Sequence, residues 1–154
     1  MQVWRITAAA HADRPLSGVG AMRFGNRWNS KGTALAYTAE NRALAALELL
    51  VHLSADQIPG YVLLGVDLPD RMVERLDPLP AGWNAYPYTP AVQRVGDEWA
   101  ASRRSLGLLV PAAVLPEEHN ILINPQHPGF SRVRVDAPRP FSFDPRLLSR
   151  VRGP

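Results

Sequence analysis

The chain has 154 residues, 46% hydrophobic and 20% charged, which is the length and composition of one compact globular domain. It lacks a run of about 18 apolar residues, as a membrane span needs, and the basic start and apolar stretch of a signal peptide. The net charge of +3 is too small to indicate nucleic-acid binding, and the lack of cysteine excludes disulfides and thiolate chemistry. We therefore expect a single domain over residues 1–154 that works in the cytoplasm, without a membrane.

The first third of the chain is predicted to combine two strands with one long helix. Residues 2–7 alternate as a strand, and the small residues from 8 to 26 indicate a loop or a short helix. Residues 33–38 have strand character. The apolar spacing over residues 39–53 predicts the best helix of the chain, with Thr38 as its N-cap.

The rest of the chain adds mostly strands. Residues 61–68 form a predicted buried strand, and residues 70–76 either a second strand or a short helix. Prolines break up residues 78–90, after which residues 91–104 form a predicted helix. Further strands are predicted at 108–114, 120–124 and 132–135. Because strands outnumber helices and do not alternate with them regularly, we expect a mixed α+β domain.

Three residues from separate segments carry the clearest chemical signal. Arg27 lies in a glycine-bounded turn, Tyr37 near a predicted strand end, and Glu48 is a lone carboxylate in an apolar stretch. A guanidinium, an aromatic ring and one anion suit an anionic, partly aromatic ligand, and we infer a dinucleotide. Each residue also has a structural interpretation. Glu48 can lie at the solvated edge of its helix, and Tyr37 in the core with its hydroxyl at the surface. Arg27 can stack on Trp28 or bind backbone carbonyls.

Other candidate signals are interpreted as structural. His52 follows Glu48 by four residues on one helical face, where a structural contact is favoured over acid–base work. The histidines show no short metal-ligand spacing, so we expect no metal. Gly18 and Gly20 do not follow a well-formed strand and lack a third glycine, so they do not indicate a Rossmann fold.

Several short motifs follow one another along residues 3 to about 130. They are Trp4-Arg5, Gly25-Asn26-Arg27-Trp28-Asn29 with Lys31-Gly32, Tyr37-Thr38, Ala46-Leu47-Glu48 with His52, Val110-Pro111-Ala112-Ala113, and Asn120 followed by Asn124-Pro125 and His127-Pro128. In this order and spacing the chain closely resembles the RES-domain family of bacterial toxins, the toxic halves of RES/Xre toxin–antitoxin pairs.

The resemblance implies a fold related to ADP-ribosyltransferases and an activity that destroys NAD, its substrate, by hydrolysis or phosphorolysis. It implies that Arg27, Tyr37 and Glu48 are catalytic, with Arg27 and Glu48 as the arginine and glutamate of the family name. The residues implied to bind NAD are Arg5, Arg27, Trp28, Tyr37 and Asn124.

One catalytic position departs from the family. Where the family usually reads Pro-Ser-Ala, this chain reads Pro111-Ala112-Ala113. Either the lineage has lost the serine or the serine was replaced deliberately. The otherwise intact pattern favours deliberate replacement. Losing one hydroxyl preserves the fold. We therefore expect an NAD-degrading toxin whose activity is impaired at Ala112.

Two other functions remain open on the same residues: transfer of ADP-ribose to a macromolecule, and a catalytically dead module that binds the antitoxin. The resemblance implies an Xre-type DNA-binding antitoxin that covers the NAD cleft, so DNA is contacted only through it. It also implies a homodimer within such complexes. Candidate contact surfaces are the proline-rich residues 78–90 and the arginine-rich residues 132–152.

Overall fold

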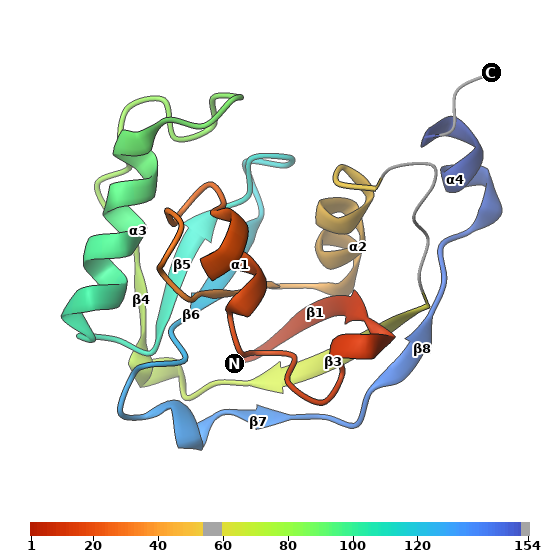
Figure 1. The fold of residues 1–154 in the computed structure, drawn as a ribbon, viewed down its shortest axis with the longest axis horizontal. Coiled ribbons are helices and arrows are strands. Elements are labelled where there is room, and N and C mark those ends of the chain that lie inside the picture. The colour runs from red at the N-terminus through yellow and green to blue at the C-terminus, as the bar shows by residue number, and fades with distance from the viewer. Residues whose placement is uncertain (54–59, 152–154) are drawn as a thin grey trace.

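The computed structural model describes residues 1–53 and 60–151, and within them it contains eight strands and four helices (Figure 1). The strands are β1 (Gln2–Ala8), β2 (Ala36–Ala39), β3 (Tyr61–Asp67), β4 (Val73–Arg75), β5 (Gly107–Pro111), β6 (His119–Ile123), β7 (Arg134–Val135) and β8 (Arg139–Phe141). The helices are α1 (Val19–Phe24), α2 (Arg42–Leu50), α3 (Pro90–Ser102) and α4 (Pro145–Val151). Short 3-10 helices cover Ala9–His11, Asp70–Met72 and Phe130–Arg132. Arg152, part of the candidate arginine-rich surface, lies outside the described residues.

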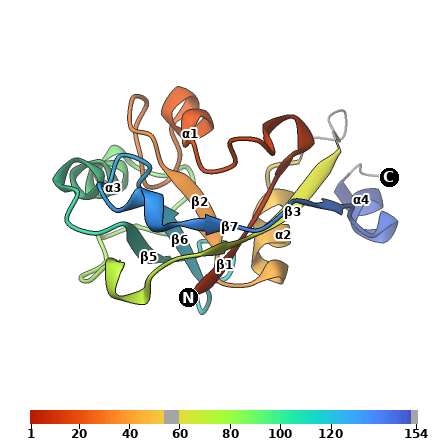
Figure 2. The ribbon, with the colours of Figure 1, turned by 90° about the horizontal axis from the view of Figure 1, so that it is seen from below.

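The strands pair into one mixed sheet in the order β4-β5-β6-β2-β1-β3-β7, and β8 also pairs with β3. Within the described residues, β4 and β5 run parallel and the other pairs antiparallel. The sheet is curled, and Figure 2 shows β5, β6 and β2 splayed away from β1 and β3. A mixed sheet with flanking helices confirms the predicted α+β class.

Apolar side chains fill both faces of the sheet because successive residues of a strand point to opposite faces. On β6, Ile121 and Ile123 belong to one core cluster, whereas Leu122 belongs to another cluster with Trp99 of α3. α2 packs on β1 and β2 through a third cluster that contains Leu44. The two longest helices therefore cover different parts of the sheet (Figure 1).

The predicted long helix is wrong at both ends, since α2 spans only Arg42–Leu50. Its N-cap is Asn41, whose side chain accepts a hydrogen bond from the Leu44 N–H at 2.8 Å. Thr38 belongs to β2 instead, and its hydroxyl donates to the Ile121 carbonyl at 2.7 Å. Thr38 and Ala39, which helix-capping rules place at the start of the helix, are thus strand residues because β2 pairs with β6.

Other predicted elements are present with shifted bounds. β5 ends at Pro111 because the chain turns there toward β6. Of the strand predicted at 132–135 only β7 remains, and both of its residues are exposed. β8 and α4 have no counterpart among the predictions, because each is short and begins beside proline. None of the described helices combines the length and apolar character that a membrane crossing requires.

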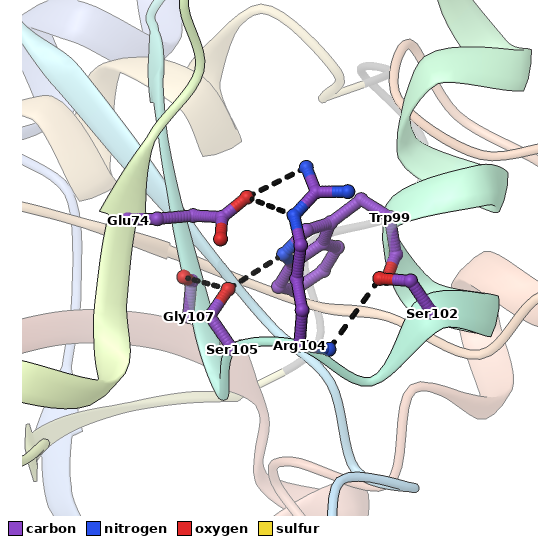
Figure 3. Close-up of polar contacts among 6 residues, drawn as sticks. All are labelled: Glu74, Trp99, Ser102, Arg104, Ser105 and Gly107. Carbon is purple, nitrogen blue, oxygen red and sulfur yellow. Dashed lines mark hydrogen bonds and ion pairs between the residues drawn. The ribbon is translucent and has the colours of Figure 1, made fainter.

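The C-terminal end of α3 is fastened to the sheet (Figure 3). The indole Nε1 of Trp99 donates to the Ser105 hydroxyl at 2.8 Å, and that hydroxyl donates to the Gly107 carbonyl of β5 at 3.1 Å. Arg104 forms an ion pair with Glu74 of β4 at 2.7 Å. Because Trp99 and Ser105 are buried, these bonds hold the end of α3 firmly against β4 and β5.

Candidate active site

A cavity of about 500 Å³ lies where β1, β2, β6 and α2 meet the turn after α1 and the loop before α3. The three residues singled out from the sequence, Arg27, Tyr37 and Glu48, all line it, and so do Arg5 and Trp28. Further aromatic and polar side chains in its wall are Trp4, Thr38, His52, Asn84, Tyr86, Tyr88 and Asn120. The fold thus brings cations, aromatic rings and the Glu48 carboxylate together from separate chain segments.

Arg27 is held by the loop before α3. Its Nη1 donates to the carbonyls of Trp83 and Ala85, both at 2.8 Å. The guanidinium carbon lies 5.7 Å from the centre of the Tyr88 ring, a cation–π contact. Arg27 therefore binds backbone carbonyls, as its structural interpretation expected, and it also lines the cavity. Because Nη1 makes both bonds to carbonyls, the Nε–Nη2 edge of the guanidinium is the edge left to meet a ligand.

Arg5 on β1 has a buried donor without a partner. Its Nη1 donates to the Tyr37 carbonyl at 2.5 Å. Its Nε is buried and, among the described side chains, has no hydrogen-bond partner. Burial lowers the pKa of Arg5 to about 10, so the guanidinium stays charged at neutral pH. A buried charged donor of this kind is costly until a ligand supplies an acceptor.

The Tyr37 hydroxyl points into the protein rather than to the surface. It donates to the Asn29 side-chain oxygen at 2.8 Å and accepts from the Trp28 backbone N–H at 3.1 Å. Burial raises the pKa of Tyr37 well above its ordinary value, so the phenol remains neutral. Tyr37 therefore ties β2 to the turn that carries Arg27.

Glu48 is half-buried and bonded to the sheet rather than fully solvated. The Asn120 side chain on β6 donates from Nδ2 to Glu48 Oε1 at 2.5 Å. His52 lines the same cavity, but it follows the end of α2 and so does not continue the helical face of Glu48. The Glu48 carboxylate thus accepts a hydrogen bond from the Asn120 amide and not from the His52 imidazole.

Ala112 and Asn124 do not reach the cavity surface, in contrast to Arg27, Tyr37 and Glu48. Ala112 is fully buried in a cluster with Ala39, although the neighbouring residues on either side line the cavity. The Asn124 side chain is also buried, and it donates to the Ala100 carbonyl of α3 at 2.8 Å. In the described structure Asn124 therefore joins β6 to α3.

Some lining residues have no site role in the sequence-based prediction. Asn120 carries a signal, because it belongs to the RES-like motifs. Tyr86 and Tyr88 fall in the proline-rich loop, and only the folded chain shows that this loop returns to Arg27. Across the described ranges no group of three or more histidine, aspartate or glutamate side chains is placed to hold a metal ion.

Comparison with known proteins gives consistent matches over most of the chain. A family model described as the RES domain matches residues 2–144. The Prs ADP-ribosylating toxin of Sphingobium sp. is 38% identical over 156 residues, covering 96% of this chain and 97% of that protein. Proteins named Toxin Res from Yersinia enterocolitica and Photorhabdus laumondii are 36% and 34% identical. Each alignment covers 96% of this chain, and 99% and 97% of the respective relatives.

The fold also matches a solved structure, the crystal structure of the M. tuberculosis MbcT–MbcA toxin–antitoxin complex. One chain of it aligns with a TM-score of 0.74, covering 99% of this chain and 89% of that chain at 22% identity. At this identity the likeness concerns the fold. The family match and the named relatives show that the chain belongs to the RES-domain family of toxins from toxin–antitoxin systems.

Proposed function

We propose that this toxin degrades NAD in the cavity, releasing nicotinamide and an ADP-ribose product by hydrolysis or phosphorolysis. The observation that supports this most directly is the meeting of two arginines, a tyrosine and a glutamate in one cavity. Its volume of about 500 Å³ is in the range of small-molecule and cofactor sites. We take residues 1–154 as a single RES domain.

The two guanidiniums would bind the pyrophosphate of NAD. Arg5 offers a buried Nε that has no partner within the described structure, and a phosphate oxygen is an acceptor that satisfies it. Arg27 offers its Nε–Nη2 edge, since its Nη1 is bonded to backbone carbonyls. Tyr37 would stack on nicotinamide. Trp28 lines the cavity but is only 2% exposed, so it would offer NAD little ring surface.

Glu48 would stabilise the reacting ribose. The bond between ribose C1′ and nicotinamide breaks, and both electrons leave with nicotinamide, which departs neutral and needs no general acid. Positive charge builds on the ribose in the transition state until water or phosphate bonds to C1′. Asn120 holds one carboxylate oxygen of Glu48, which leaves the other for the ribose 2′-hydroxyl and the developing charge.

Ala112 would impair this activity in the present chain. The proposal rests on the family pattern, in which serine occupies this position. The position is fully buried directly behind the cavity wall formed by Pro111 and Ala113. A serine hydroxyl there would add a polar group beside the site, and alanine removes it.

We also propose that an Xre-type antitoxin covers the cavity and that the toxin acts in the cytoplasm, where NAD is available. The solved neighbour is a toxin–antitoxin complex, which supports an antitoxin as partner. DNA would be contacted only through that antitoxin, and a homodimer would form within the complex.

A second candidate function uses the same cavity. The name of the Sphingobium relative states an ADP-ribosylating activity, which favours transfer of ADP-ribose to a macromolecule as the alternative to release. A third reading, a catalytically dead module that occupies the antitoxin, follows from the alanine at position 112 alone.

One experiment separates these functions. The Ala112→Ser variant, with the unchanged chain as control, is incubated with NAD labelled in its ADP-ribose half and with a bacterial lysate. Free labelled product supports NAD degradation. Label on protein or nucleic acid supports transfer, and unchanged NAD supports the inactive module and contradicts our proposal.

A further inference from the structure

We infer that Gln93 on α3 is a positioning residue, which holds the turn that carries Arg27 in the orientation that NAD binding requires. The inference rests on the proposed function, because it assumes that Arg27 binds the pyrophosphate. Gln93 itself is not among the residues that line the cavity.

Gln93 bonds to both ends of the Arg27 turn. Its Nε2 donates to the carbonyls of Asn26 and Asn29, each at 3.0 Å. These residues flank Arg27 and Trp28, and the turn is closed by a bond from the Asn26 N–H to the Asn29 carbonyl at 2.8 Å. A single side-chain amide therefore fixes the turn at the two points where it enters and leaves the cavity wall.

The next turn of α3 continues the same contact. Asp97 accepts from the Ser30 N–H at 3.0 Å and from the Ser30 hydroxyl at 2.6 Å. Gly96 lies between Gln93 and Asp97 on this helix, and a Cβ added to it would stand 1.8 Å from the Trp28 carbonyl oxygen. Positions 93, 96 and 97 share one helical face, so this face is shaped to receive the turn.

α3 is a rigid support for this turn because its other end is anchored. Figure 3 shows Trp99 bonded to Ser105, and Arg104 paired with Glu74, which joins the helix end to β5 and β4. The loop just before α3 supplies the two carbonyls that hold the Arg27 guanidinium. One stretch of chain, residues 83–97, therefore positions both the backbone and the side chain of Arg27.

This arrangement predicts an effect on affinity and not on the chemical step. The bonds from Arg27 to a pyrophosphate are made in the bound substrate and in the transition state alike, so weakening them raises KM and leaves kcat unchanged. Glu48 lies on α2 and is held by Asn120 of β6, neither of which contacts Gln93 through a recorded hydrogen bond.

The test uses Gln93→Met, which keeps the length of the side chain and removes its donors. Arg94→Ala, an exposed neighbour on the same helix, is the matched control, and Asp97→Ala loosens the same turn at its other contact. NAD is titrated by calorimetry into each variant, and KM and kcat are measured in the Ala112→Ser background. We expect Gln93→Met and Asp97→Ala to weaken NAD binding roughly tenfold, with kcat within about twofold and Arg94→Ala unchanged.

A lower melting temperature with unchanged NAD affinity in Gln93→Met would overturn the inference, because the bond would then be merely structural. If Gln93→Met does not fold, the NAD affinity of Asp97→Ala tests the inference in the same way.

Arg27→Ala separates the two proposals. If Arg27→Ala binds NAD as tightly as the unchanged chain, the proposed role of Arg27 fails and this inference with it. If Arg27→Ala is weak and Gln93→Met is not, only this inference fails.

Discussion

Arg5 shows how one residue can be unfavourable for the fold and useful for binding. Its guanidinium is charged, and its buried Nε finds no acceptor among the described side chains. Burying an incompletely bonded charge reduces stability, and in this cavity the same charge is available to an anionic ligand. Under the proposed function, a phosphate oxygen of NAD supplies the acceptor that Arg5 Nε lacks.

Replacing Arg5 with methionine should separate the two effects. We expect Arg5→Met to raise the free energy of unfolding by about 1 kcal/mol and to weaken NAD binding by more than about tenfold. Urea unfolding and NAD titration measure the two quantities. A variant that is less stable than the unchanged chain, or that binds NAD as tightly, contradicts this account.

The pKa of Arg5 sets the pH range of that stability difference. Burial lowers the folded-state pKa of Arg5 from its ordinary value to about 10, so the charge disfavours folding. Below pH 10 both the folded and unfolded states carry the charge, and the full cost is present. This cost in folding free energy disappears only as pH rises above about 10, toward the ordinary pKa of arginine. The difference in free energy of unfolding between Arg5→Met and the unchanged chain should therefore be constant between about pH 6 and 9. Urea unfolding at steps of roughly one pH unit measures this difference.

Ala112 is the second residue at which a single substitution tests the proposed function. Ala112→Ser adds a hydroxyl at a fully buried position behind the cavity wall. We expect the variant to fold, to consume NAD at least roughly tenfold faster than the unchanged chain, and to slow the growth of its host. Equal NAD loss and equal growth for the two chains would show that the missing hydroxyl does not limit this copy.

At the level of elements, the contact of α3 with the Arg27 turn depends on a close approach of backbones. Gly96→Ala gains about 1 kcal/mol of helix propensity, yet its Cβ would stand 1.8 Å from the Trp28 carbonyl oxygen. The clash must displace the turn or the helix, so we expect a net loss of about 3 kcal/mol. The matched control is Gly20→Ala in α1, where an added Cβ meets nothing within 4 Å.

Thermal and urea unfolding compare the two glycine variants directly. Gly20→Ala should be neutral or slightly stabilising, whereas Gly96→Ala should unfold at a clearly lower urea concentration and bind NAD more weakly. Equal stability of the two variants would mean that α3 does not constrain the turn.

Local sequence signals predict the elements of this fold better than their ends. Periodicity identifies the helix that carries Glu48, but the N-cap is wrong because Thr38 is taken into β2 by pairing with β6. Local patterns also miss β8, whose pairing with β3 is a long-range contact. Element type is local information, whereas element ends are decided by partners distant in sequence.

The same limit applies to the site. Residue type and family motif identify Arg5, Arg27 and Glu48, all of which line the cavity. No local pattern distinguishes Asn124, which lies inside the protein, from Asn120, which bonds to Glu48. The loop that holds Arg27 is also invisible to such patterns, because its contribution is made by backbone carbonyls.

At the scale of the whole molecule, the curled sheet assembles the site from early and late segments. The described lining residues lie between Trp4 and Asn120, and the family match ends at residue 144. α4 follows that point, and its Leu147 is 43% exposed. α4 is therefore expected to be dispensable for binding.

Removing residues 145–154 tests this expectation. The shortened chain should bind NAD with unchanged affinity and lose less than about 1 kcal/mol of unfolding free energy. Calorimetric titration and urea unfolding provide both values. A loss of NAD affinity in a chain that still folds would show that α4 contributes to the site.

The most direct test of NAD degradation in this cavity is the rate of NAD loss in purified Glu48→Gln, measured beside its parent in the Ala112→Ser background. The substitution keeps the size of the side chain and removes the anion that we propose stabilises the ribose. The account predicts a roughly hundredfold slower loss of NAD, equivalent to about 3 kcal/mol of transition-state stabilisation, in a protein with unchanged melting temperature. An unchanged rate of NAD loss in Glu48→Gln would contradict it.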